Sequence, residues 1–166
     1  MKAETVVELV KFLRSHGIDV VVDGGWGVDA LIGEQTRLHD DLDIAIPHKD
    51  VPKLRRVLGE RGFSETFRKD SRDCNFVLQD ESGNLLDVHS YTFDANGRNI
   101  YGVAYLPEHL TGEGMINGFA VKCIPPEWSV NFHTGYDLDE NDFRDVKALC
   151  EKFDLELPDD YEKFIK

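Results

Sequence analysis

Apolar side chains recur along the first third of the chain with two alternating spacings, one helical and one extended. Apolar positions from Val6 to Leu13 repeat every three or four residues, which predicts a helix over residues 3–15, and Gly17 suits the position just past its end. The β-branched run IDVVV and the alternating LDIAI predict two strands. Two amphipathic segments between and after them predict helices, so the expected order is strand 18–22, helix 26–33, strand 42–46 and helix 49–62.

The second part of the chain reads as strands followed by helices. Further strands are expected around residues 63–68, 74–79, 84–91 and 118–125. Residues 92–118 give no clean period, which predicts a loop with at most a short hairpin. From Pro126 the pattern is helical, with Asp139 as N-cap of a long helix, Asp142 at its third position, and a last short helix from Pro158.

These elements predict one domain of the α+β class, in which helices flank a mixed β-sheet. A chain of 166 residues is long enough to bury a substantial core. We expect residues 1–125 to form the α/β core and residues 126–166 a short C-terminal helical segment.

The net charge of the chain limits which ligands and partners it is expected to bind. The formal net charge is −13, from 32 acidic and 19 basic residues, which repels nucleic acid and anionic membranes and attracts cations. No apolar run reaches the roughly 20 residues that cross a bilayer, and the N-terminus lacks the core of a signal peptide. Cys74, Cys123 and Cys150 form no CxxC pair, so they are expected to be plain thiols. The predicted location is the cytoplasm.

Two aspartates on the strand 42–46 are the first candidate for chemistry. Asp41 and Asp43 stand two residues apart, so their carboxylates project from one face, about 6.6 Å apart along the strand. Their mutual repulsion is relieved by a divalent cation, and carboxylate oxygens are the ligands that Mg²⁺ prefers. The alternative is a solvated strand end, because Asp-x-Asp is common by chance.

A glycine pair, Gly24 and Gly25, separates the first predicted strand from the next helix. Backbone N–H groups at such a point favour phosphate oxygens, and the absence of side chains allows close approach. An ordinary turn is the alternative. The pair matches neither the Walker pattern nor the dinucleotide-binding pattern.

The glycine pair and the Asp-x-Asp strand together are a more specific signal than either motif alone. A Gly-Gly-Trp turn, an Asp-x-Asp strand and a third acid, Asp87 in LLDVH, resemble the nucleotidyltransferase superfamily. The stretch at 23–46 (DGGWGVDALIGEQTRLHDDLDIAI) is similar to the small antibiotic nucleotidyltransferases that act on lincosamides and on the 2″-hydroxyl of aminoglycosides. The stretch at 132–149 (FHTGYDLDENDFRDVKAL) is similar to the lincosamide enzymes. The resemblance spans residues 5–91 and 120–150 and is absent at 92–118, a region that contacts the acceptor in enzymes of this kind.

The resemblance implies a role for each of these positions. Asp41 and Asp43 would hold one or two Mg²⁺ ions, and Asp87 would complete the metal site and act as general base. Gly24 and Gly25 would seat the β- and γ-phosphates of a nucleoside triphosphate, with ATP as the expected co-substrate. Attack of an alcohol on phosphorus needs a proton acceptor and metal stabilisation of the attacking and leaving oxygens, which three converging carboxylates supply.

Five further residues complete the predicted site. Arg37 and Lys147 are candidate phosphate contacts, with solvated side chains as the alternative. His89 shares a strand face with Asp87, so it is expected to contact substrate or to orient the base, with a buried structural histidine as the alternative. By the resemblance, His133 and Tyr136 line the substrate site. Trp26 and His39 are expected to be structural.

The sequence therefore predicts a Mg²⁺-dependent enzyme that transfers AMP from ATP to a hydroxyl of a small molecule, with a lincosamide as the leading acceptor. An aminoglycoside acceptor suits the acidic charge better, and a minimal nucleotidyltransferase antitoxin that modifies a helical protein is a further alternative. A housekeeping enzyme with a natural metabolite is the third. Because the chain is short for two substrates, a homodimer is expected to complete the cleft.

Overall fold

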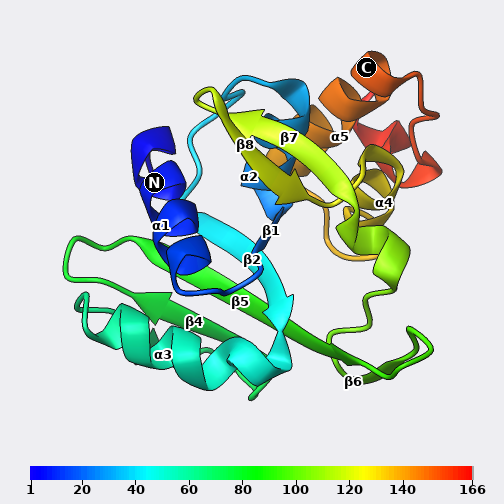
Figure 1. Cartoon of the computed structure of the whole chain (residues 1–166). Helices are drawn as coiled ribbons and strands as arrows, with labels where there is room; N and C mark the ends of the chain where they lie inside the picture. Colours follow the sequence, from blue (N-terminus) through cyan, green and yellow to red (C-terminus); the bar gives the residue numbers. More distant parts are fainter. Residues whose placement is uncertain (166) are drawn as a thin grey trace.

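Eight strands form a single mixed sheet in the computed structural model of the protein, which describes residues 1–165 (Figure 1). Their order is β3-β4-β5-β2-β1-β8-β7, and β6 pairs with β5 beside this path. β2 and β5 are parallel neighbours, as are β1 and β8, and the other pairs are antiparallel. The strands are β1 (Val21–Asp23), β2 (Asp41–Pro47), β3 (Ser64–Thr66), β4 (Asn75–Gln79), β5 (Leu85–Phe93), β6 (Asn99–Gly102), β7 (Gly112–Ile116) and β8 (Phe119–Cys123).

In the described part of the chain, residues 1–165, five α-helices and three 3₁₀ turns surround the sheet. Figure 1 shows α3 running alongside β4, and α4 and α5 gathered near α2. They are α1 (Ala3–Ser15), α2 (Gly24–Ile32), α3 (Val51–Gly59), α4 (Pro126–Phe132) and α5 (Glu140–Phe153), with 3₁₀ turns η1 (His48–Asp50), η2 (Pro107–Leu110) and η3 (Asp159–Phe164). Within residues 1–165, no helix combines the length and apolarity that a membrane span needs.

The alternation of side chains along the central strands separates two faces of the sheet. Val22, Ile44 and Val88 lie in register on β1, β2 and β5, are fully buried, and belong to the larger core with α1 and α3. The opposite face carries Val21 and Ala45 in a smaller apolar cluster. Because side chains alternate, the aspartates of these strands project on this second face.

Local signals at the helix ends agree with the sequence. Asp139 caps α5 and forms a capping box with Asp142, and Gly33 ends α2 with φ +87°. Gly17 lies just past α1 with φ +69°. The helix predicted at 49–62 is shorter, because η1 precedes it, and the last short helix after Pro158 is a 3₁₀ turn.

The prediction for residues 92–118 is wrong in part. β6 pairs antiparallel with β5, and β7 forms a hairpin with β8, so two strands of the sheet lie within the segment. Both strands lie outside the centre of the sheet and carry glycines where backbones approach closely. A methyl on Gly114 would collide with the backbone of Ala30, for example. β6 and β7 lack the alternation of apolar and polar residues from which a strand is predicted.

Candidate active site

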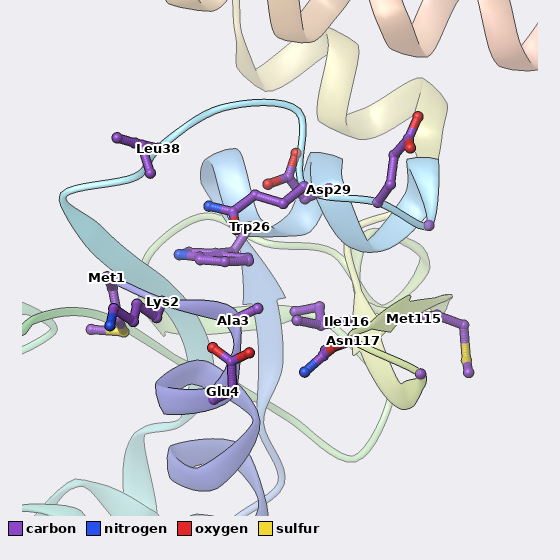
Figure 2. A pocket seen from close by; sticks show the side chains of 14 residues that line it. Met1, Lys2, Ala3, Glu4, Trp26, Asp29, Leu38, Met115, Ile116 and Asn117 are labelled. Carbon is purple, nitrogen blue, oxygen red and sulfur yellow. The ribbon is translucent and has the colours of Figure 1, made fainter.

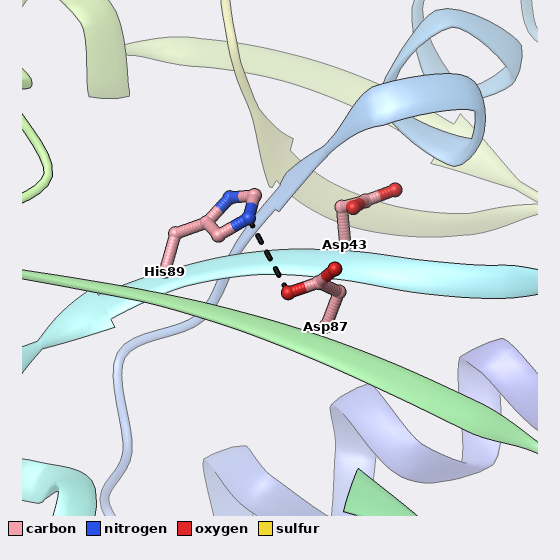
Figure 3. Close-up of side chains that lie close together, drawn as sticks. All are labelled: Asp43, Asp87 and His89. Atoms are coloured by element: carbon pink, nitrogen blue, oxygen red, sulfur yellow. Dashed lines mark ion pairs between the residues drawn. The ribbon is translucent and has the colours of Figure 1, made fainter. Parts of the chain in front are cut away.

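Three aspartates lie side by side across the centre of the sheet. Asp23 on β1 pairs in register with Asp43 on β2, and Asp43 pairs in register with Asp87 on β5. Directly paired residues on neighbouring strands have Cβ atoms about 5 Å apart on one face. Figure 3 shows the carboxylates of Asp43 and Asp87 projecting to the same side of β2 and β5, with His89 beside them.

The geometry of this group fits a divalent cation. One ligand atom each from Asp43, Asp87 and His89 lies within 4.8 Å of the other two. Asp87 Oδ1 is buried and accepts no hydrogen bond, a costly state that a metal ligand bond would relieve. A set of two carboxylates with a free oxygen suits Mg²⁺.

Asp43 carries the strongest electrostatic signature. Burial, the nearby charge of Asp41, and the charges of Asp23 and Asp87 raise the pKa of Asp43 to about 8, and His89 opposes them. Crowded carboxylates of this kind are paired at functional sites with a cation that restores their ionised form.

Asp23 was not singled out from the sequence, although it directly precedes the glycine pair. Its carboxylate accepts hydrogen bonds from Gly24 N at 2.8 Å and from Tyr105 Oη at 2.7 Å. Burial and Asp23 raise the pKa of Tyr105 well above its ordinary value. The hydroxyl therefore stays protonated and donates a hydrogen bond to Asp23. An acid at the end of a strand, immediately before a glycine-started helix, is the signal that identifies it.

His89 links Asp87 to the hydroxyl of Tyr105, and through it to Asp23. Its Nδ1 lies 3.3 Å from Tyr105 Oη and its Nε2 lies 3.4 Å from Asp87 Oδ1. Burial lowers the pKa of His89, but the neighbouring Asp87 carboxylate and the charges of Asp43 and Asp23 outweigh it and raise that pKa overall. His89 therefore lies where the sequence placed it, on the face of Asp87.

Asp23, Asp43 and Asp87 form a row across the sheet, the acidic row, and Asp41 lies at its margin. It shares the face of Asp43, but it is not among the three residues whose ligand atoms converge. Its Oδ2 is 4.0 Å from Arg68, whose Nη1 donates to Asp87 Oδ2 at 3.0 Å. Arg68 was missed from the sequence, because it reaches Asp87 from the β3–β4 connection, across β4.

The glycine pair opens α2 and is required by its neighbours. Gly24 has φ +57°, and a Cβ there would collide with the Asp43 carboxylate. A Cβ on Gly25 would collide with the His39 ring and the Arg37 guanidinium. The close approach predicted at this pair is therefore made, in part, by the protein's own side chains.

Arg37 and His39 are held by buried acids. Arg37 donates from Nε and Nη2 to Asp145, which is 1 % exposed, at 3.1 and 2.7 Å. His39 Nε2 forms an ion pair with buried Asp29, and its ring lies against Trp26. His39 and Trp26 thus have the structural setting predicted for them, whereas the Arg37 guanidinium is already engaged by Asp145.

A cleft of about 680 Å³ opens beside the acidic row. The predicted residues Gly24, Asp43, His89, His133 and Tyr136 line it. Its other lining residues are Asp23, Val103, Ala104, Tyr105, Asn131, Phe132 and Thr134. The segment at 92–118, expected to contact the acceptor, thus contributes three of them.

Lys147 is not brought to this cleft. It lies on α5, where its Nζ is 3.7 Å from Glu151, and it lines two other surface hollows. The reason is geometric, since the face of α5 that packs inward carries Val146 and Leu149. This position does not support the predicted phosphate contact.

A second hollow, of about 520 Å³, lies between the N-terminus, α2 and the β7–β8 hairpin (Figure 2). Trp26 lines it, and its indole Nε1 is buried without a hydrogen-bond partner. The acids of the sheet row are not part of this hollow.

Two solved structures of antibiotic-modifying enzymes superpose on this chain. The lincosamide antibiotic adenylyltransferase LnuA, in a lincomycin-bound crystal structure, superposes with a TM-score of 0.78 at 25% identity, over 90% of this chain and 96% of that one. ANT(2")-Ia, in complex with adenylyl-2"-tobramycin, superposes with a TM-score of 0.73 at 18% identity, over 91% and 88% of the two chains.

The chain belongs to the aminoglycoside-2''-adenylyltransferase family, whose family model matches residues 5–149. A lincosamide resistance protein of Staphylococcus haemolyticus is 34% identical over 134 residues, or 77% of this chain and 81% of that protein. A 2''-aminoglycoside nucleotidyltransferase of Escherichia coli is 30% identical over 108 residues, covering 61% of this chain and 55% of the relative. The predicted class, an antibiotic nucleotidyltransferase of the α+β type, is confirmed.

Proposed function

We propose that the protein is a Mg²⁺-dependent enzyme that transfers AMP from ATP to a hydroxyl of a lincosamide-type small molecule. The observation that carries this proposal is the register of Asp43 with Asp87 on adjacent strands, which places the Asp87 carboxylate next to Asp43, a residue that lines the cleft. The unsatisfied Asp87 Oδ1, and the crowding of carboxylates that raises the pKa of Asp43, both favour a bound cation at this place.

The chemistry follows from the positions of these groups. Asp43 and Asp87, with Asp41 at the margin, would hold the magnesium, which stabilises charge on the attacking and leaving oxygens. Asp87 accepts the proton of the acceptor hydroxyl as its oxygen attacks the α-phosphorus, and pyrophosphate leaves. The first turn of α2, at Gly24 and Gly25, directs the positive end of the helix dipole to the phosphates.

The walls of the cleft support a small acceptor with an apolar body. Val103, Ala104 and Phe132 supply apolar surface, while His133 and Tyr136 supply polar groups. The S. haemolyticus relative is named for lincosamide resistance, and the chain covers most of its length. An aminoglycoside is the second candidate, favoured by the net charge of −13 and by the E. coli relative.

The direct test is turnover with Mg-ATP and a panel of acceptors. We expect pyrophosphate release with a lincosamide, and a mass increase of the drug by one AMP unit. Asp87→Asn should lower kcat by about 10²- to 10⁴-fold, the usual contribution of a general base. Glu81→Gln is the matched control, since Glu81 is an exposed acid in the turn before β5.

Turnover by Asp87→Asn at the level of Glu81→Gln would contradict the assignment of the base. If only aminoglycosides in the panel gain mass, the acceptor is an aminoglycoside and not a lincosamide. Absence of pyrophosphate with every drug and every nucleoside triphosphate would contradict the proposed activity itself.

A further inference from the structure

Arg68 is the arginine whose guanidinium reaches the acidic row. Its Nη1 donates to Asp87 Oδ2 at 3.0 Å, and its Nη2 lies 4.0 Å from Asp41 Oδ2. One cation therefore contacts two of the three acids that the sequence assigned to metal binding. It does so in a chain with a net charge of −13.

The backbone of Arg68 is anchored, while its side chain is accessible. Arg68 N donates to Ser71 Oγ at 2.8 Å, and Ser71 N donates to Arg68 O at 3.0 Å, which closes a turn in the β3–β4 connection. The Arg68 side chain is 41% exposed. The guanidinium can therefore change partner by side-chain rotation, without unfolding of the connection.

The two cations that the sequence proposed for phosphate binding are engaged elsewhere. Arg37 is held by buried Asp145 through three hydrogen bonds, and Lys147 lies beside Glu151 on α5. A triphosphate held against several carboxylates needs more positive charge than a single magnesium ion brings. Arg68 stands next to the carboxylates that would hold the metal, so it is well placed to supply the missing positive charge.

Arg68 also occupies an oxygen that catalysis needs. A carboxylate oxygen that accepts a charge-assisted hydrogen bond from arginine is a weaker metal ligand and a weaker base. Asp87 Oδ1 accepts no hydrogen bond and lies 3.4 Å from His89 Nε2, whereas Oδ2 accepts a hydrogen bond from Arg68 Nη1. In the nucleotide-free protein, Arg68 and a divalent cation therefore compete for Asp87.

We propose that Arg68 is an exchangeable counter-ion that leaves Asp87 for the triphosphate when the metal–nucleotide complex binds. The guanidinium fork matches phosphate oxygens in bidentate geometry, so the arginine exchanges one anionic partner for another. This inference rests on the proposed function, because it takes a metal–nucleotide complex as the ligand.

The exchange predicts effects of opposite sign on two affinities. Loss of the guanidinium in Arg68→Gln removes a competitor, so the nucleotide-free protein should bind Mn²⁺ about two- to fivefold more tightly, as for a half-exposed ion pair. The same variant should bind a non-hydrolysable ATP analogue with Mg²⁺ about tenfold more weakly, because charged hydrogen bonds to phosphate are lost. A residue that merely supports the fold would lower both affinities together.

The experiment uses the full chain, as wild type and as point variants. Mn²⁺ binding is measured without nucleotide from the electron paramagnetic resonance of free Mn²⁺, and analogue binding by calorimetry in Mg²⁺. Arg72→Gln is the matched control, since Arg72 is an exposed arginine of the same connection and should leave both affinities unchanged. Arg68→Lys should lie between the wild type and Arg68→Gln in both titrations, and melting temperatures verify that each variant folds.

The outcomes separate this inference from the proposed function. Unchanged Mn²⁺ affinity in Arg68→Gln, a parallel loss of both affinities, or an unchanged analogue affinity overturns the exchange and leaves the metal site intact. If the wild type binds no Mn²⁺, or if Asp87→Asn binds it equally well, the metal site of the proposed function fails and the exchange fails with it.

Discussion

Gly24 occupies a position that no other residue fits. Its φ is +57°, and a Cβ would collide with the carboxylate of Asp43. We expect Gly24→Ala to destabilise the protein by about 2–4 kcal/mol, from left-handed backbone strain of about 1–2 kcal/mol and steric overlap of a similar size. Because Asp43 must move to admit the methyl group, the variant should also lose Mn²⁺ affinity in the titration above.

The matched control is Gly33→Ala, which shares the backbone strain without the collision. Gly33 has φ +87°, and a Cβ at this position would meet no atom within 4 Å, so only the strain of about 1–2 kcal/mol is expected. Urea unfolding measures both variants. Equal destabilisation and equal Mn²⁺ affinity in the two would show that Asp43 does not restrict Gly24.

The crowding of Asp43 predicts a pH dependence of stability. Its pKa is raised to about 8 in the folded protein, so the folded state binds more protons than the unfolded state between about pH 4 and pH 8. The contribution of Asp43 to the free energy of unfolding is therefore greatest below pH 4 and falls as the pH rises toward 8. In EDTA, Asp43→Asn should be more stable than wild type at pH 8.5, and this advantage should shrink toward pH 5.

Thermal melting across this pH range measures the difference between the two proteins. Asp73→Asn, which removes an exposed carboxyl of the β3–β4 connection, is the control variant. Added Mg²⁺ should raise the melting temperature of wild type more at pH 8.5 than at pH 5, because protons and metal compete. A wild-type advantage over Asp43→Asn that grows with pH would contradict the assigned cause.

At the scale of elements, Arg37 and Asp145 tie the α2–β2 connection to α5. Asp145 is 1 % exposed, so its removal leaves the largely buried Arg37 charge without a partner. We expect Asp145→Asn to cost about 3 kcal/mol of unfolding free energy. Lys147→Gln, which breaks a surface pair with Glu151 on the same helix, should cost less than about 1 kcal/mol.

Urea unfolding of the two variants checks this prediction. A cost for Asp145→Asn no larger than for Lys147→Gln would show that Arg37 is not primarily structural. In that case Arg37 would regain the phosphate role expected from the sequence.

Elements with strong local signals were predictable, and those that depend on distant pairing were not. The capped helix α5 and the apolar strands β2 and β5 follow from spacing and caps within a few residues. β6 and β7 owe their existence to partners on β5 and β8, which local periodicity does not reveal. The same reason hid Arg68, whose contact with Asp87 arises from the pairing of β4 with β5.

At the scale of the whole molecule, the acidic charge and the short chain shape the remaining expectations. A net charge of −13 favours cationic ligands and disfavours nucleic acid. The homodimer expected from chain length stays part of the proposal. Light scattering at assay concentration should give a mass of twice 18.9 kDa. A monomer that is fully active would contradict the homodimer.

In the proposed function, Asp43 and Asp87 together hold a divalent cation beside the cleft. The most direct measurement is the anomalous diffraction of a crystal soaked with Mn²⁺ and a non-hydrolysable ATP analogue. We expect a manganese peak within ligand distance of both carboxylates, with the triphosphate extending toward α2. A peak that touches neither carboxylate, beside a nucleotide bound elsewhere on the protein, would contradict it.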